Sequence, residues 1–129
     1  MTSHADLILS SDGQNPLQRI ISDTKSFTSR HIRKLLKDKN AVGESRREWK
    51  YGMMKEAGIH NSNNHDFQFW QQHNQPIVLD SNELIDQKVN YIHNNPVEAG
   101  FVAEPEDWLY GSAVDFTLSG KGLMKLATF

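Results

Sequence analysis

Apolar residues recur at roughly helical spacing after Pro16, with basic residues on the opposite face. The apolar positions are Leu17, Ile20, Ile21, Phe27, Ile32, Leu35 and Leu36. The basic positions are Arg19, Lys25, Arg30, Arg33, Lys34 and Lys37. This pattern predicts an amphipathic helix from Pro16 to near Asp38, with one face in the core and the other face basic. Asn15 is a candidate cap, and proline is well suited to a first helical turn.

Three later segments also have the spacing of helices, namely 44–58, 81–96 and a shorter one over 105–116. Gly58 is expected to end the first of these helices. Ser81 or Asn82 would cap the start of the second. Pro96 would prevent extension of that helix, because proline has no N–H to continue the hydrogen bonding.

Strand-like runs occupy the remaining apolar segments: 5–11, two runs within 67–81, and 122–129. A polar loop is expected over 59–66. The order of elements predicts an α+β fold, in which helices flank a mostly antiparallel sheet. At 129 residues the chain is expected to form a single domain over 1–129.

Composition restricts the chemistry of the chain. The longest apolar runs are only a few residues, too short for a transmembrane helix or a signal peptide, so no membrane partner is expected. The absence of cysteine excludes disulfides, thiolate catalysis and cysteine zinc sites, and it agrees with a cytoplasmic location.

The net charge of −2 hides an uneven distribution. The segment 19–50 holds ten of the fourteen basic residues against four acids, a balance of +6, whereas the rest of the chain carries −8. A basic segment suits a polyanion such as nucleic acid, because each neutralised phosphate releases counterions. Charge alone nevertheless favours an ordinary solvated helix face.

The stretch "YIHNNPVEAG" (91–100) combines a phenol, an imidazole and two carboxamides at a helix end. Tyr91 and Asn95 are one turn apart and share a helix face, while His93 points elsewhere. A tyrosine hydroxyl, with a pKa of about 10, is a weak nucleophile unless a cation or base lies close. An Asn95 oxygen could hold a divalent ion. The simpler interpretation is a half-buried Tyr91 and an Asn95 that caps the helix.

A second candidate site lies in "MTSHADLIL" at the N-terminus. His4 and Asp6 alternate with Ala5, so on a strand both side chains would face the same way. Imidazole and carboxylate are plausible ligands of magnesium, manganese or a transition metal. A terminus with a stray histidine is the alternative interpretation.

The same segments resemble a known family. "MTSHADLIL" is similar to a histidine motif of the IS200-like, single-tyrosine, HUH-type transposases, and "YIHNNPVEAGFVAEPEDWLYGSA" (91–113) resembles their C-terminal signature. The branch that the chain most resembles is the REP-associated tyrosine transposases, which 61–96 also fits. The resemblance implies a ferredoxin-like or RRM-like HUH fold.

The resemblance also implies roles for particular residues. Tyr91 would attack a DNA phosphodiester and become joined to the 5′-phosphate, with cleavage and rejoining of hairpin or single-stranded DNA as the function. His4, Asp6 and Asn95 would hold Mg²⁺ or Mn²⁺, with His93 as the competing third ligand. The residues expected to bind the DNA backbone are Arg30, Arg33, Lys34, Lys37, Arg46 and Arg47.

Two departures from the family pattern give rise to alternatives. Asp6 stands where the family has its second histidine, and a strand and helix that usually precede the motif are not present. An exposed sheet edge would then favour a homodimer. The alternatives are a catalytically inactive relative that only binds DNA hairpins, and a structural protein in which 91–95 merely end a helix.

Overall fold

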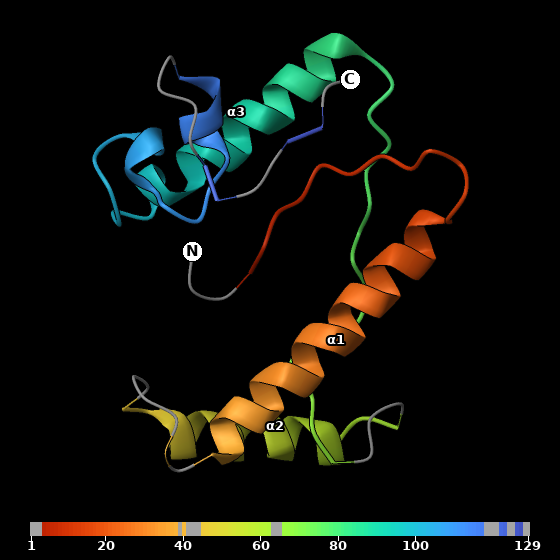
Figure 1. The fold of residues 1–129 in the computed structure, drawn as a ribbon, viewed down its shortest axis with the longest axis vertical. Helices are drawn as coiled ribbons and strands as arrows, with labels where there is room; N and C mark the ends of the chain where they lie inside the picture. Colours follow the sequence, from red (N-terminus) through yellow and green to blue (C-terminus); the bar gives the residue numbers. More distant parts are fainter. Residues whose placement is uncertain are drawn as a thin grey trace. The chain divides into compact units, whose positions relative to one another are not determined.

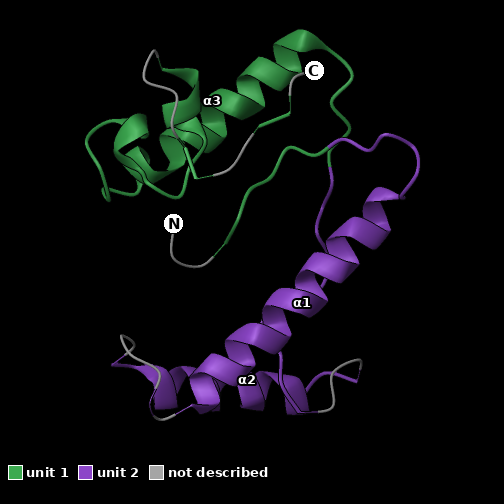
Figure 2. Ribbon diagram, in the orientation of Figure 1, with its two compact units in different colours: residues 1–9, 77–129 green, residues 10–76 purple. Residues whose placement is uncertain are grey.

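The computed structural model describes residues 4–38, 40, 45–62, 66–117, 122–123 and 126–127. Its elements, shown in Figure 1, are α1 (Leu17–Lys37), α2 (Arg47–Ile59), α3 (Asn82–Glu98) and two 3₁₀ turns, η1 (Pro105–Asp107) and η2 (Ala113–Phe116). The chain divides into two compact units, one of Met1–Leu9 with Ile77–Phe129 and the other of Ser10–Pro76 (Figure 2). We refer to them as the terminal unit and the central unit; the expectation of a single domain stays a prediction.

The predicted sheet is not formed, and the α+β fold class is wrong for the part of the chain that the structure describes. Residues 5–11 and 67–81 have no strand partner there, and half of the run 122–129 (124–125 and 128–129) lies outside the described residues. Within 67–81, His73 and Gln75 have positive φ angles of 68° and 47°, which interrupt an extended chain. The amide of Gln68 bonds to the carbonyl of Met54 in α2 (2.8 Å), so a helix provides the partner that a strand would have supplied.

The three long helices agree with the sequence pattern, although their ends differ in detail. α1 follows Pro16 directly, but no side chain caps it, and the carbonyl of Asn15 instead accepts a hydrogen bond from Ser11 Oγ. α2 starts at Arg47, after the predicted start at 44, and ends just past Gly58. Local hydrogen bonding decides where a helix forms, whereas its last turn depends on neighbours that periodicity does not show.

α3 begins at the predicted cap but does not stop at the predicted proline. Ser81 Oγ accepts a hydrogen bond from the backbone N–H of Leu84 at 3.2 Å. Pro96 lies inside the helix, which continues to Glu98, so the expectation that it ends the helix is wrong. In the last turn a proline removes only its own N–H bond, and the amide of Ala99 still donates to Asn95 O at 3.0 Å.

The core of the central unit lies between α2, the C-terminal half of α1 and the chain after α2 (Figure 1). Phe67, which is only 7% exposed, contacts the ring of Tyr51 with centroids 5.7 Å apart. Trp70 Nε1 donates to Thr28 Oγ1 on α1 over 2.7 Å. Gly58 is buried where α2 passes Phe67.

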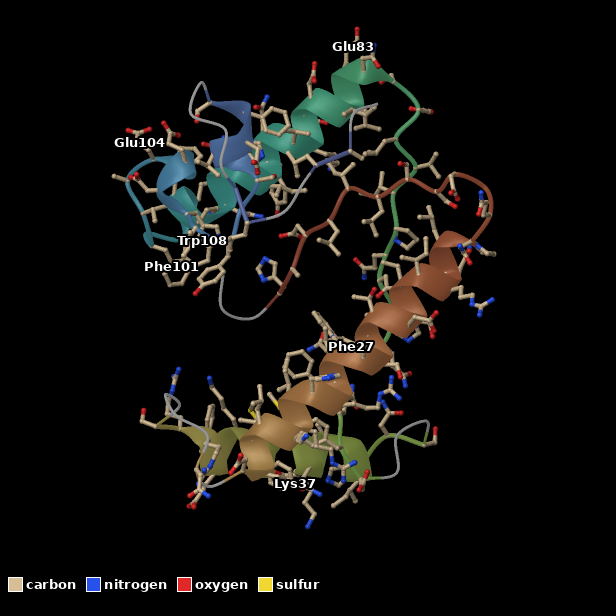
Figure 3. The ribbon with its side chains drawn as sticks, in the orientation of Figure 1. Phe27, Lys37, Glu83, Phe101, Glu104 and Trp108 are labelled. Carbon is tan, nitrogen blue, oxygen red and sulfur yellow. The ribbon has the colours of Figure 1, made fainter. Side chains whose placement is uncertain are left out.

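In the terminal unit, α3 contacts η1, and η1 contacts η2. The short helix predicted over 105–116 is therefore two separate 3₁₀ turns. Phe101 and Trp108, labelled in Figure 3, lie beside each other with ring centroids 5.7 Å apart. Ala113 (6% exposed), Asn95 (9%) and Pro96 are the buried residues of this unit among those described. None of the helices in the described ranges has the length and apolar character needed to span a membrane.

Candidate functional site

Three of the predicted site residues meet in the terminal unit. Asn95 Nδ2, on α3, donates a hydrogen bond to Asp6 Oδ2 over 3.1 Å. His4 Nε2 lies 3.5 Å from the same carboxylate oxygen. The N-terminal segment therefore returns to the tyrosine helix 89 positions later in the chain. We call His4, Asp6 and Asn95 the terminal triad.

Exposure differs across the terminal triad. Asn95 is buried, while the side chains of His4 and Asp6 are 49% and 36% exposed. The triad therefore has a fixed carboxamide at its base and an imidazole and a carboxylate open to water. This arrangement leaves one side accessible to a ligand.

The donor set of the terminal triad fits a hard divalent cation. No group of three His, Cys, Asp or Glu side chains within the described ranges is placed to hold a metal ion, so the third ligand would be the Asn95 carboxamide. Contacts of 3.1 and 3.5 Å to Asp6 are close to the spacing of about 3 Å between ligands of one octahedral ion. Asn95 would turn its amide to present Oδ1, a change that conserves shape. Binding of Mg²⁺ or Mn²⁺ stays a prediction.

Tyr91 lies on α3 one turn before Asn95. Residues four apart share a helix face, so the phenol projects from the side of α3 that carries the terminal triad's carboxamide. Tyr91 is 53% exposed, which leaves it accessible to a macromolecular substrate. Lys88 Nζ lies 5.9 Å from the centre of its ring. Lys88 was not among the predicted site residues, although its position three residues before Tyr91 is a usable signal.

His93, the competing third ligand, faces other neighbours. Its Nε2 is 3.0 Å from Ser112 Oγ, and its ring meets the edge of Phe116 with centroids 5.0 Å apart. Burial lowers the pKa of His93 below its ordinary value, because desolvation penalises the imidazolium. The structure thus brings Asn95, and not His93, to Asp6.

The six residues predicted to bind DNA fall into two groups, all in the central unit. Arg30, Lys34 and Lys37 are exposed on α1. Lys37 Nζ, at the C-terminal end of α1 (Figure 3), lies 5.9 Å from the ring centre of Tyr51. Arg46 is exposed beside the start of α2. These side chains are positioned at the surface, as binding to phosphate requires.

The other two arginines make contacts inside the central unit. Arg33 forms a bidentate ion pair with Asp66, in which Nη1 lies 3.0 Å from Oδ1. The guanidinium of Arg33 also lies 5.3 Å from the ring centre of Phe67. Hydrogen bonding to Asp66 raises the pKa of Arg33. Arg47 donates to the carbonyl of Asp38 at 2.6 Å. Both arginines join segments of the unit, which the count of charges in the sequence does not reveal.

A scan against protein-family models finds no match to this chain, and searches of curated proteins and of solved structures also find none.

Proposed function

We propose that this protein cleaves and rejoins DNA strands through a tyrosine nucleophile, Tyr91, at a site where the terminal triad holds a divalent cation. The observation that carries the proposal is the contact of His4 and Asn95 with one oxygen of Asp6, one helical turn from Tyr91. His4 and Asp6 lie far from Tyr91 and Asn95 in the sequence. The proposal depends on these side chains and not on the predicted sheet.

The reaction is a transfer between two phosphodiesters. The Tyr91 oxygen forms a bond to phosphorus while the bond from phosphorus to the 3′-oxygen breaks, and the 3′-oxygen leaves with a proton. The phenolic proton is released to solvent. Attack by a 3′-hydroxyl on the phosphotyrosine reverses these steps and rejoins the strand. The terminal triad would hold the divalent cation, which when bound would stabilise the charge on the phosphoryl oxygens.

The protein's own residues have distinct tasks in this proposal. Asp6 and His4 would provide a charged and a neutral ligand to the cation, and the buried Asn95 holds Asp6 at α3 through a hydrogen bond. The exposed Tyr91 can reach a strand in solvent, and the ammonium of Lys88 beside it would neutralise part of the phosphate charge. The exposed cations of α1 support a polyanionic substrate.

Formation of a covalent adduct tests the proposal. A pool of hairpin oligonucleotides with randomised single-stranded flanks and a 3′ fluorophore would be incubated with Mn²⁺ and resolved on a denaturing protein gel. We expect wild type to carry a labelled adduct, Tyr91→Phe to carry none, and a chelator to abolish it, because phenylalanine lacks the attacking oxygen. Tyr110→Phe is the matched control, since Tyr110 is an exposed tyrosine (77%) outside the site. An adduct on Tyr91→Phe equal to that on wild type would refute the proposal.

A DNA-binding protein that does not cut is the second candidate, and one observation favours it. Asn95 donates its N–H to Asp6, so this pair is hydrogen-bonded without any cation. Asp6 also stands where the resembling family has a histidine. The same oligonucleotide pool separates the two functions: salt-sensitive binding with no adduct under Mg²⁺ or Mn²⁺ identifies the binding protein.

A further inference from the structure

One stripe of α1 lines an open groove in the central unit. The residues of this stripe are Phe27, Arg30, His31 and Lys34, which follow the spacing of one helix face, and the groove has a volume of about 420 Å³. We call this surface the Phe27 groove. It runs for about 10 Å along the helix, given a rise of about 1.5 Å per residue.

The other face of α1 makes the contacts that hold the central unit together. Thr28 accepts from Trp70, Arg33 pairs with Asp66, and Lys25 Nζ donates to the carbonyl of Gln71 at 3.0 Å. Phe27 lies on the opposite side and is 55% exposed. The sequence pattern predicts Phe27 on the core face and Lys25 and Arg33 on a solvated basic face. These predictions are wrong, because Phe27 is exposed while Lys25 and Arg33 bond within the unit. The basic face therefore contains an aromatic residue.

Phe27 and His31 form a paired aromatic surface. Their ring centroids are 4.0 Å apart, and the planes are inclined by 32°. His31 Nδ1 lies 2.9 Å from the Phe27 carbonyl oxygen, which can only accept, so this nitrogen carries the proton. The hydrogen bond holds the imidazole beside the phenyl ring and limits the rotation that would be lost on stacking a ligand.

The positive charge around these rings indicates which class of ligand the groove would bind. Arg30 and Lys34 line the same groove, within a segment of +6. Aromatic rings flanked by positively charged side chains match a ligand that has planar bases and a chain of phosphates. A paired duplex hides its base faces, and an acidic peptide does not carry an aromatic ring at every residue. Single-stranded nucleic acid is the occupant that uses both features.

We propose that the Phe27 groove binds single-stranded DNA, with Phe27 and His31 stacking on bases and Arg30 and Lys34 contacting phosphates. The choice of DNA over RNA rests on the proposed function, because neither ring stacking nor phosphate contact reads the 2′-hydroxyl. The inference adds to that function the surface that would hold a single strand and the two rings, Phe27 and His31, that would stack on its bases.

Fluorescence anisotropy in the presence of a chelator tests the groove without any cleavage. The probe is a labelled oligothymidylate of about twelve nucleotides, within the range covered by single-strand binding surfaces. We expect Phe27→Ala to weaken binding about 5- to 150-fold, the range measured for loss of one stacked base, with an unchanged salt dependence. Phe27→Trp should restore binding, because it keeps a stacking ring.

Charge variants and matched controls complete the experiment. Arg30→Gln with Lys34→Gln should reduce the slope of log affinity against log salt by about 1.4, from about 0.7 per phosphate contact. Leu35→Ala and Arg19→Gln are the controls, since both residues are exposed on α1 and do not line the groove. Both controls should bind as wild type does.

Several outcomes would overturn the groove proposal. These are wild-type affinity in Phe27→Ala, equal binding of a blunt duplex, no binding of the probe, or tighter binding of the matching oligouridylate or of a polyglutamate peptide. Adduct formation on Tyr91 separates the two proposals. If wild type forms the adduct but Phe27→Ala binds the probe as tightly as wild type, only the groove proposal is rejected. If Phe27→Ala weakens binding but wild type forms no adduct, only strand cleavage is rejected.

Discussion

Gly58 lies at the closest approach of α2 to the chain that follows it. A Cβ atom built there would be 2.2 Å from Phe67 N and 2.6 Å from Phe67 Cα, and both of these are backbone atoms that cannot rotate away. The sequence suggested that this glycine ends a helix, but the helix continues to Ile59. The requirement for glycine here is therefore close packing and not termination.

Gly58→Ala is accordingly expected to lower the free energy of unfolding by at least about 2 kcal/mol, measured by urea denaturation, because the added methyl forces α2 away from Phe67. Gly52→Ala is a matched control in the same helix, where a Cβ would meet nothing within 4 Å. It should stabilise the protein by about 0.5–1 kcal/mol through helix propensity. Equal effects of the two substitutions would contradict this account.

At the scale of elements, α1 and the chain after α2 are joined by one ion pair with defined geometry. Arg33 uses two nitrogens on Asp66 and covers the ring of Phe67. Its side chain is 31% exposed and that of Asp66 is 58% exposed, so water screens part of the attraction. The contribution of this pair to stability therefore depends more on its two parallel hydrogen bonds and on the packing of the guanidinium over Phe67 than on charge attraction.

Arg33→Lys keeps the charge but loses the bidentate hydrogen bonds and the planar contact with Phe67. We expect it to lower the free energy of unfolding by about 1 kcal/mol. A double-mutant cycle with Asp66→Asn, followed by urea denaturation, measures the coupling. Arg19→Lys serves as control, since Arg19 and Asp23 are 72% and 74% exposed and should contribute little. A loss in Arg19→Lys as large as that in Arg33→Lys would contradict the assignment.

At the scale of the whole molecule, charge separates between the two units. The central unit has eleven basic and seven acidic residues, a balance of +4, and the terminal unit has three basic and nine acidic residues, a balance of −6. The candidate nucleophile and the terminal triad belong to the acidic unit, while the Phe27 groove belongs to the basic one. A divalent cation would offset some of the negative charge around Tyr91.

The stability of the whole chain is expected to depend on pH through His93. Because burial lowers its pKa in the folded state, the unfolded chain binds more protons at His93 once the pH falls below about 6.5. The contribution of His93 to the free energy of unfolding should therefore be complete above that pH and decrease as the pH falls below it. Urea denaturation at several pH values measures this decrease.

His93→Gln should remove this part of the pH dependence, since glutamine does not titrate. Ser112→Ala is the informative control: it deletes the hydrogen bond at Nε2 but leaves the burial, so the dependence should persist. An unchanged pH profile in His93→Gln would show that other groups are responsible.

The error in fold class has a physical origin. A strand satisfies its backbone hydrogen bonds only through a partner, so the strand-like runs within 67–81 form strands only if a neighbouring strand exists. Gln68 bonds to α2, and His73 and Gln75 turn the chain by positive φ angles. Likewise, Phe27 is exposed and Arg33 packs inside the unit, the reverse of what the sequence pattern predicts. Spacing defines the faces of a helix but not which face packs against a neighbour.

The sequence by itself determined the three helices, the cap at Ser81 and the shared face of Tyr91 and Asn95, because these depend on hydrogen bonds and spacings within a few residues. Only the tertiary structure decided that Asp6 meets Asn95 and not His93, that Arg33 pairs with Asp66, and that Phe27 stays exposed. Such contacts join segments distant along the chain. Their formation depends on the path of the backbone between them, which no local pattern specifies.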